Sequence, residues 1–244
     1  MPLRAILALL ALAGLALPAG AQTVDELIAR NLEAKGGLER IKAVETLRVT
    51  GRTTGPGAEA PFVMEVKRPN RMRMEITLRG ETMIQAFDGE KAWQIVPGKP
   101  EPQVLPEQAA RAMREQADFT GPLADAKANG LEVTYGGLVK LDTGEAHRLD
   151  LTTKGGEKRS VFLDAKTYLE VRGEATIQAG GRTLTMVSLI GDYRPADGLV
   201  LPHRVESGVR GAAQRMRMTI DKVELGVPID DARFAMPEKP EKKG

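Results

Sequence analysis

Apolar and polar residues alternate most regularly between Phe62 and Pro97. Apolar side chains occupy every second position from 62 to 66 and again from 72 to 78, which is the spacing of strands with one buried face. The turn signals in this block are Lys67-Arg68-Pro69-Asn70, Arg79-Gly80-Glu81 and Asp88-Gly89-Glu90. The pattern predicts a meander of antiparallel hairpins in an open sheet whose apolar face holds something apolar.

Helical spacing replaces the alternation elsewhere. Thr23 and Glu26 form a capping box before an apolar stripe that ends at Gly36-Gly37. The other helical segments are Leu38 to Ala43, Glu107 to Ala117, which is rich in good helix formers, and the less regular Pro122 to Ala128. The segment after Thr23 is amphipathic and needs a partner surface, the segment from Glu107 to Ala117 has a weaker apolar stripe, and the segment from Pro122 to Ala128 is only a possible helical turn.

The second half of the chain returns to the period of two. Its predicted strands are Leu131 to Tyr135, Ala146 to Thr152, Ser160 to Asp164, Tyr168 to Gln178, Arg182 to Tyr193, Val200 to Glu206 and Gln214 to Leu225. A first strand in Val44 to Thr54 and the four of the block from Phe62 to Pro97 make five in the first half, so the chain has about eleven or twelve. Its size is normal for one all-β domain. Because strands outnumber helices, the expected fold class is mainly β (α+β).

The N-terminus has the features of a secretory signal peptide. Arg4 precedes an apolar run from Ala5 to Leu17, and Pro18-Ala19-Gly20-Ala21 is a small-residue cleavage signature. The run has about 13 residues, fewer than the roughly 20 that span a membrane, so an uncleaved anchor is the weaker alternative. The resulting division is a signal peptide at 1–21, a folded domain at 22–237 and a disordered charged tail at 238–244. We expect a periplasmic protein.

Charge and cysteine content narrow the function classes. The 35 basic and 33 acidic residues nearly cancel and are dispersed, which gives no electrostatic case for nucleic-acid binding. The chain has no cysteine. It therefore forms no disulfide, and it cannot carry the lipid that a bacterial lipoprotein attaches to a cysteine at its cleavage site.

The residue types that catalyse reactions or bind metals form no recognisable motif. No serine lies in a Gly-x-Ser-x-Gly elbow, and the chain has neither a P-loop nor a dinucleotide fingerprint. His147 and His203 are far apart and lack metal-ligand spacing, and we expect His203 at the surface, near a strand end. We therefore expect no enzyme activity, no metal and no cofactor.

The order of the predicted elements resembles the LolA family of periplasmic lipoprotein carriers. The likeness extends from about Val24 to Pro237. The segments that carry it are Lys67-Arg68-Pro69-Asn70, Asp88-Gly89-Glu90-Lys91-Ala92-Trp93, Phe162-Leu163-Asp164-Ala165-Lys166-Thr167-Tyr168 and Phe234-Ala235-Met236-Pro237. The resemblance implies an incomplete antiparallel β-barrel of about eleven strands, with an α-helical lid over a hydrophobic cavity for acyl chains.

The resemblance also implies roles for individual residues. Arg68 matches the family's lid latch, whose guanidinium holds backbone carbonyls of the lid until lipid enters, and five donors in a rigid fork suit that task. The strands carry flexible methionines where the family carriers carry aromatic residues. The expected lining residues are Phe62, Met64, Val66, Met72, Met74, Ile76, Met83, Trp93, Met113, Met186, Met216 and Met218. Ordinary core packing is the alternative role for the set, and for Trp93 it is the favoured one.

With export to the periplasm, the resemblance implies a monomeric carrier that binds acyl chains of lipoproteins or lipids and shuttles them toward the outer membrane. Its partners would be an ATP-driven release complex in the inner membrane and an acceptor in the outer membrane. The missing cysteine fits the shuttle better than the receptor, which is itself a lipoprotein. The alternatives are a periplasmic lipid- or lipoprotein-sensing regulatory module with the same fold, and an envelope protein whose own side chains fill the cavity.

Overall fold

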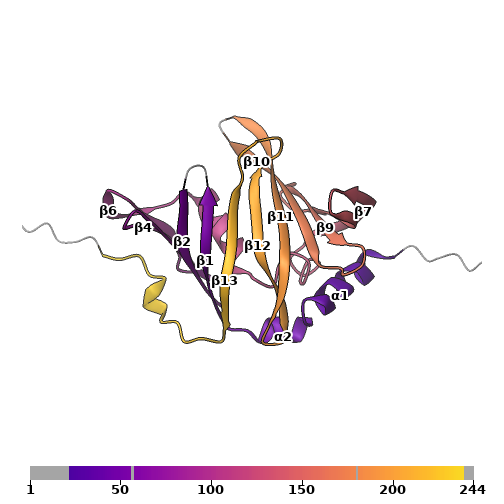
Figure 1. Ribbon diagram of the computed structural model, residues 1–244, viewed down its shortest axis with the longest axis horizontal. Coiled ribbons are helices and arrows are strands. Elements are labelled where there is room, and N and C mark those ends of the chain that lie inside the picture. The colour runs from indigo at the N-terminus through magenta and orange to yellow at the C-terminus, as the bar shows by residue number, and fades with distance from the viewer. Residues whose placement is uncertain (1–21, 56–57, 180, 239–244) are drawn as a thin grey trace, which may run out of the picture.

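Figure 1 presents the computed structural model, which describes residues 22–55, 58–179 and 181–238. The predicted signal peptide lies outside the described residues, as do positions 239–244 of the predicted tail. In the described part of the chain, no helix is long and apolar enough to cross a membrane.

One open antiparallel sheet of thirteen strands makes up most of the described chain. The strands are β1 (Thr46–Gly55), β2 (Ala58–Lys67), β3 (Arg71–Leu78), β4 (Glu81–Phe87), β5 (Ala92–Val96), β6 (Lys99–Val104), β7 (Glu132–Leu141), β8 (Gly144–Thr152), β9 (Lys158–Asp164), β10 (Glu170–Ala179), β11 (Arg182–Ala196), β12 (Leu199–Val209) and β13 (Met216–Leu225). Their order is β6-β5-β4-β3-β2-β1-β13-β12-β11-β10-β9-β8-β7. Two meanders are therefore joined by one ladder between β1 and β13, which confirms the predicted mainly-β, incomplete barrel.

The predicted number of strands, about eleven or twelve, was too low because β6 shows no strand signal. Pro100 and Pro102 lie within it, and proline cannot donate a hydrogen bond to a ladder. The structure tolerates them because β6 is an edge strand that pairs only with β5. An edge strand needs hydrogen-bond donors on one side alone, so the proline positions cost it little.

The helices are α1 (Val24–Ala34), α2 (Leu38–Ala43) and α3 (Glu107–Ala117), as predicted. The capping box at α1 is complete, because the Thr23 hydroxyl accepts from the Glu26 amide and the Glu26 carboxylate accepts from the Thr23 amide. The segment from Pro122 to Ala128 forms successive turns and not a helix.

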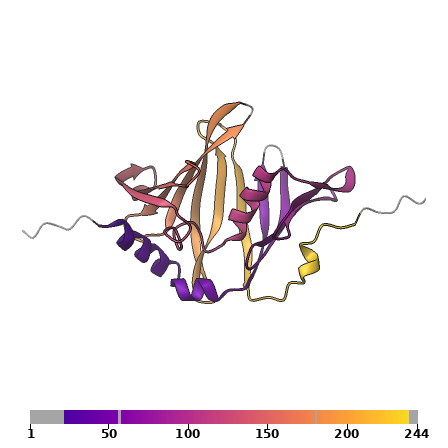
Figure 2. The same ribbon diagram turned by 180° about the vertical axis from the view of Figure 1, so that it is seen from behind.

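The sheet has an inner face, on which α1 and α3 lie, and an outer face (Figure 2). On one side, α3 buries Met113 against Met72 of β3. On the other side, α1 buries Leu27 against Leu149 of β8. Strand pairing carries the same face continuously from Met72 across the sheet to Leu149. The helices therefore cover the two ends of one surface.

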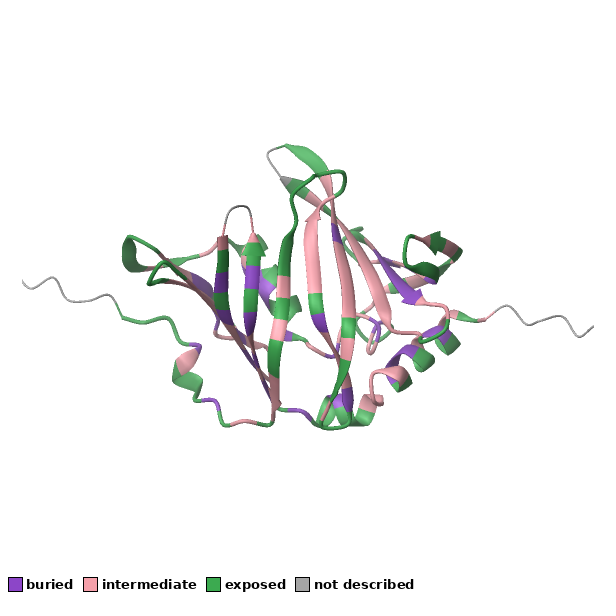
Figure 3. Ribbon diagram, in the orientation of Figure 1, coloured by how far each residue is buried: buried purple, intermediate pink, exposed green. Residues whose placement is uncertain are grey.

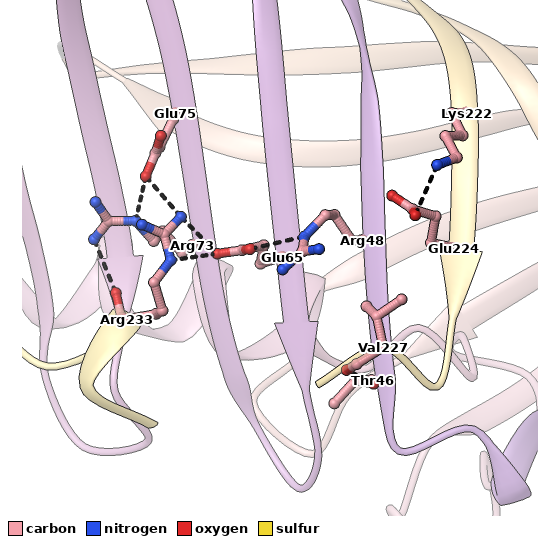
Figure 4. Close-up of polar contacts among 9 residues, drawn as sticks. All are labelled: Thr46, Arg48, Glu65, Arg73, Glu75, Lys222, Glu224, Val227 and Arg233. Carbon is pink, nitrogen blue, oxygen red and sulfur yellow. Dashed lines mark hydrogen bonds and ion pairs between the residues drawn. The ribbon is translucent and has the colours of Figure 1, made fainter. Parts of the chain in front are cut away.

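The outer face is charged and is partly covered by the chain after β13. Phe234 in that segment is fully buried, and its carbonyl accepts a hydrogen bond of 2.8 Å from the Trp93 indole. Arg233 donates to Glu65 at 2.9 Å and to Glu75 at 3.0 Å (Figure 4). Burial opposes ionisation of Glu75, but its arginine partners hold the pKa of that carboxyl below its usual value. The C-terminal segment is thus fastened to the outside of β2–β5.

Candidate functional site

The middle of the inner face is apolar and only partly covered. Figure 2 shows the central strands behind α3 and the turns that follow it, and Figure 3 colours β11 and β12 mostly as half-buried. Alternation along β11, β12 and β13 places nine side chains there, all half-buried or exposed. We call these residues the open strip: Met186, Ser188, Ile190, Val205, Ser207, Val209, Met216, Met218 and Ile220. Met216 is the most exposed of the nine, with 48% of its surface accessible to solvent. A partly covered apolar surface of this kind indicates a binding site, because isolated exposed apolar residues are common but grouped ones are not.

Helix α3 lies on the inner face and contacts both meanders of the sheet, which we call its two walls: β1–β6 and β7–β13. Its apolar side packs on β3–β5, and its other side reaches β9 and the turn before it. Arg159 bonds Glu115, and Arg111 lies 3.3 Å from Glu157. These ion pairs are largely exposed, so each holds the helix only weakly. The α3 helix is therefore held firmly to one wall and loosely to the other.

Arg68 lies where the end of β2, helix α2 and the turns after α3 meet. Its guanidinium donates from Nε to the Val44 carbonyl at 2.9 Å, and from Nη2 to the Ile41 carbonyl at 3.2 Å. The same Nη2 donates to the Thr120 hydroxyl at 2.9 Å, and the guanidinium carbon lies 4.4 Å from the centre of the Phe119 ring. One side chain thus joins the end of β2 to α2 and to the turns after α3.

The sequence analysis singled out Arg68 but not its contacts Phe119 and Thr120. Neither residue lies in a predicted element, and both follow the end of α3. Thr120 is 3% exposed, which is unusual for a hydroxyl residue in a turn. Only the fold brings it to a residue on β2, so no local signal identifies it.

Eleven of the twelve predicted lining residues lie on the inner face or on the side of α3 that faces it. Four are buried beneath or within α3, and seven are half-buried or exposed. The buried four are Phe62, Val66, Met72 and Met113. The others are Met64, Met74, Ile76, Met83, Met186, Met216 and Met218. The predicted lining residues, apart from Trp93, therefore gather on one face of the sheet and on the side of α3 that packs against it.

Two residues lie where the sequence did not place them. Trp93 pairs with Ala86, which puts it on the outer face beneath the C-terminal segment, and it is fully buried. It therefore does not line the inner face, and its core role holds. His203 was expected at the surface but is 6% exposed, because strand alternation turns it inward beside the open strip.

His147 belongs to a small aromatic cluster under α1. Its ring stacks on Tyr168 with centroids 5.9 Å apart, and its Nδ1 lies 3.1 Å from the Tyr135 hydroxyl. Burial holds the pKa of His147 below its ordinary value. Arg30 and Asn31 of α1 donate hydrogen bonds to Tyr168, so the cluster joins α1 to β7, β8 and the turn before β10. Within residues 22–55, 58–179 and 181–238, no three His, Asp or Glu side chains gather as a metal site.

No protein-family profile matches the chain, and no curated protein matches it in sequence. Solved structures match its fold. A LolA superfamily protein from Nitrosomonas europaea aligns with a TM-score of 0.59 at 17% identity, covering 88% of this chain and 98% of that one. A DUF1329 family protein from Desulfovibrio piger aligns with a TM-score of 0.59 at 11% identity, covering 87% and 97%.

A putative outer membrane lipoprotein-sorting protein domain from Vibrio parahaemolyticus aligns with a TM-score of 0.56 at 10% identity, covering 85% of this chain and 97% of that one. These alignments extend over nearly the whole length of each neighbour. The described chain therefore has a LolA-like fold.

Proposed function

From this LolA-like fold, we propose that the chain is a periplasmic carrier that binds acyl chains on the inner face of its sheet. The observation that carries the proposal is the open strip, an apolar surface between two covered ends of the same face. Half-buried methionines suit a ligand of variable shape, because their side chains are flexible and polarizable. We infer that acyl chains occupy the open strip and extend under α3.

Arg68 would act as the latch in this carrier. It holds two carbonyls at the α2 end of the lid and one hydroxyl in the turns after α3. A ligand that entered from the open strip toward Leu199 and Leu201 would displace the side chains of α2 packed on them. Loss of those contacts would release the guanidinium, so lid opening and ligand entry would be coupled.

Delivery would need an external energy source. Burying each methylene is worth about 0.8 kcal/mol, so an acyl chain leaves a membrane only if the carrier buries it nearly as well. The chain has no nucleotide-binding motif to drive extraction. We therefore propose that it receives cargo from an ATP-driven complex in the inner membrane and gives it to an acceptor in the outer membrane, without catalysing a reaction itself.

Native mass spectrometry of protein purified from the periplasm tests the proposal, together with uptake of an acyl-chain fluorophore. Val205→Gln on the open strip should lower fluorophore uptake, because it places an amide in the apolar surface. Arg204→Gln is the matched control, since this neighbouring side chain is exposed on the outer face. Recovery of the wild-type protein without bound lipid or lipoprotein, combined with no fluorophore uptake, would refute the carrier function.

A further inference from the structure

The inner face carries hydroxyl groups where an apolar side chain would fill the wall better. Ser188 of β11 and Ser207 of β12 pair across the strands, and their Oγ atoms lie 2.9 Å apart. Both lie in the middle of the open strip, Ser188 between Met186 and Ile190 along β11 and Ser207 between Val205 and Val209 along β12. Two hydroxyls have two protons, and their mutual bond uses one. The pair can therefore donate one further hydrogen bond toward the inner face.

Thr53 is a second and independent hydroxyl on the same face. It pairs with Ala60 on one side and Met218 on the other, which places it one strand away from β13. Thr53 is 7% exposed, and its Oγ1 has no hydrogen-bond partner among the described residues. A buried hydroxyl without a partner destabilises a fold, so its retention calls for an explanation.

Strand spacing gives the separation of these groups. Ser207 and Thr53 are two strands apart and one inner-face position apart along the strands. With strands about 4.8 Å apart and about 3.3 Å per residue, the two positions are roughly 10–12 Å apart. The inner-face positions that flank Ser207 along β12 are Val205 and Val209, and those that pair with Thr53 are Ala60 and Met218, so no acidic or basic side chain adjoins either hydroxyl in the strand register. Such donors would bind neutral acceptors, such as carbonyl oxygens.

We propose that the ligand brings carbonyl oxygens of its acyl linkages into the inner face, where the Ser188–Ser207 pair donates one hydrogen bond to them and Thr53 donates another. This inference rests on the proposed function, since it concerns the same surface. It selects acyl chains joined by ester or amide bonds over plain alkyl chains. The flexible neighbour Met218 would move aside to expose the Thr53 hydroxyl.

Two matched lipids test the proposal. Short-chain dihexanoyl phosphatidylglycerol and its di-O-hexyl ether analogue differ only in the two carbonyl oxygens. Each displaces a bound acyl fluorophore, which gives its Kd. We expect the wild-type protein to bind the ester about tenfold more tightly, which corresponds to ~1.4 kcal/mol. In Thr53→Val and in Ser188→Ala/Ser207→Ala, the preference should fall below about threefold with ether binding unchanged.

A stability measurement separates a binding role from a structural one. Thr53→Val keeps the shape of the side chain and removes the unpartnered hydroxyl, so its melting temperature should rise by about 2–4 °C. Thr54→Val is the control, because Thr54 is exposed on the other face and should change neither property. A lower melting temperature for Thr53→Val would show that the hydroxyl stabilises the fold, and would overturn its assigned role.

The outcomes also distinguish this inference from the proposed function. Equal wild-type affinity for ester and ether would overturn carbonyl recognition and leave the carrier intact. Failure to bind either lipid would overturn both. A diacylglyceryl-cysteine peptide with the same chains, compared with the phosphatidylglycerol ester, identifies the source of the acyl group: tighter binding of the peptide indicates a lipoprotein, and tighter binding of the ester indicates a phospholipid.

Discussion

Replacing Arg68 by leucine should loosen the lid while leaving the sheet folded. The substitution removes three hydrogen bonds from one charged group, to Val44, Ile41 and Thr120. Hydrogen bonds of this kind contribute about 1.5–3 kcal/mol each in mutational series. They share one half-exposed side chain and are not additive, so we expect a net loss of about 2–3 kcal/mol in the free energy of lid opening.

Amide hydrogen exchange measures that free energy locally. Since ~1.36 kcal/mol is a factor of ten, exchange in residues 38–44 should become about 30- to 150-fold faster in Arg68→Leu. Arg68→Lys should give a smaller increase, because lysine keeps the charge but lacks the planar fork. Loading with an acyl fluorophore should also become faster in Arg68→Leu.

Two controls make the result interpretable. Exchange in β8 and β9 should stay at the wild-type rate, because a global loss of stability would accelerate those strands as well. Arg71→Leu removes a neighbouring arginine that pairs with Asp231 away from the lid, and should not change α2 exchange. An exchange rate in residues 38–44 of Arg68→Leu within threefold of wild type, in a folded protein, would refute the latch.

Three further outcomes follow from the outer face and from α1. Arg233→Ala should lower the free energy of unfolding by about 1–2 kcal/mol in urea titrations, because it removes a partner of the buried Glu65; its own partial exposure limits the loss. Phe234→Ala should cost about 3–5 kcal/mol in the same assay, whereas the exposed Met236→Ala should cost little. The third outcome concerns pH: because burial holds the folded-state pKa of His147 below the ordinary histidine value of about 6.5, the unfolded chain binds a proton first as the pH falls. Stability should therefore decrease below about pH 6.5, and His147→Phe should show a flatter pH profile; an unchanged slope would contradict the assignment.

Local patterns predicted the elements well. The capping box at Thr23, the alternation along β2 and β3, and the helix formers of α3 each depend on neighbours in sequence, and each element formed as expected. Proline concealed β6, because edge strands tolerate a residue that strand signals exclude. The latch role of Arg68 was predicted from the family resemblance and stays a prediction, since nothing in the local sequence distinguishes a latch from a solvated arginine; the structure adds the contacts of Arg68 with Val44, Ile41 and Thr120.

The face of a strand was harder to predict than the strand. Trp93 alternates correctly, but its face is decided by Phe234, which lies 141 residues later and covers the outer side. His203 follows Pro202 in a predicted strand and was expected at the surface, yet the alternation along β12 turns its ring inward and buries it. Thr53 reads as an ordinary strand residue. Its missing partner becomes visible only when every neighbour in the sheet is known.

The ladder between β1 and β13 has a consequence for how the chain reaches this structure. All the remaining strand pairs join strands that are consecutive in sequence, so each meander can form hairpin by hairpin. Leu47 must meet Leu225, about 180 residues later, before the two meanders join, and that loop closure carries the largest entropy cost. Until they meet, β1 and β13 are unpaired edge strands with apolar side chains. The chain is therefore most prone to aggregation when both meanders have formed but have not yet joined. Joining the halves is therefore the slow step that protects the protein as well as completing it.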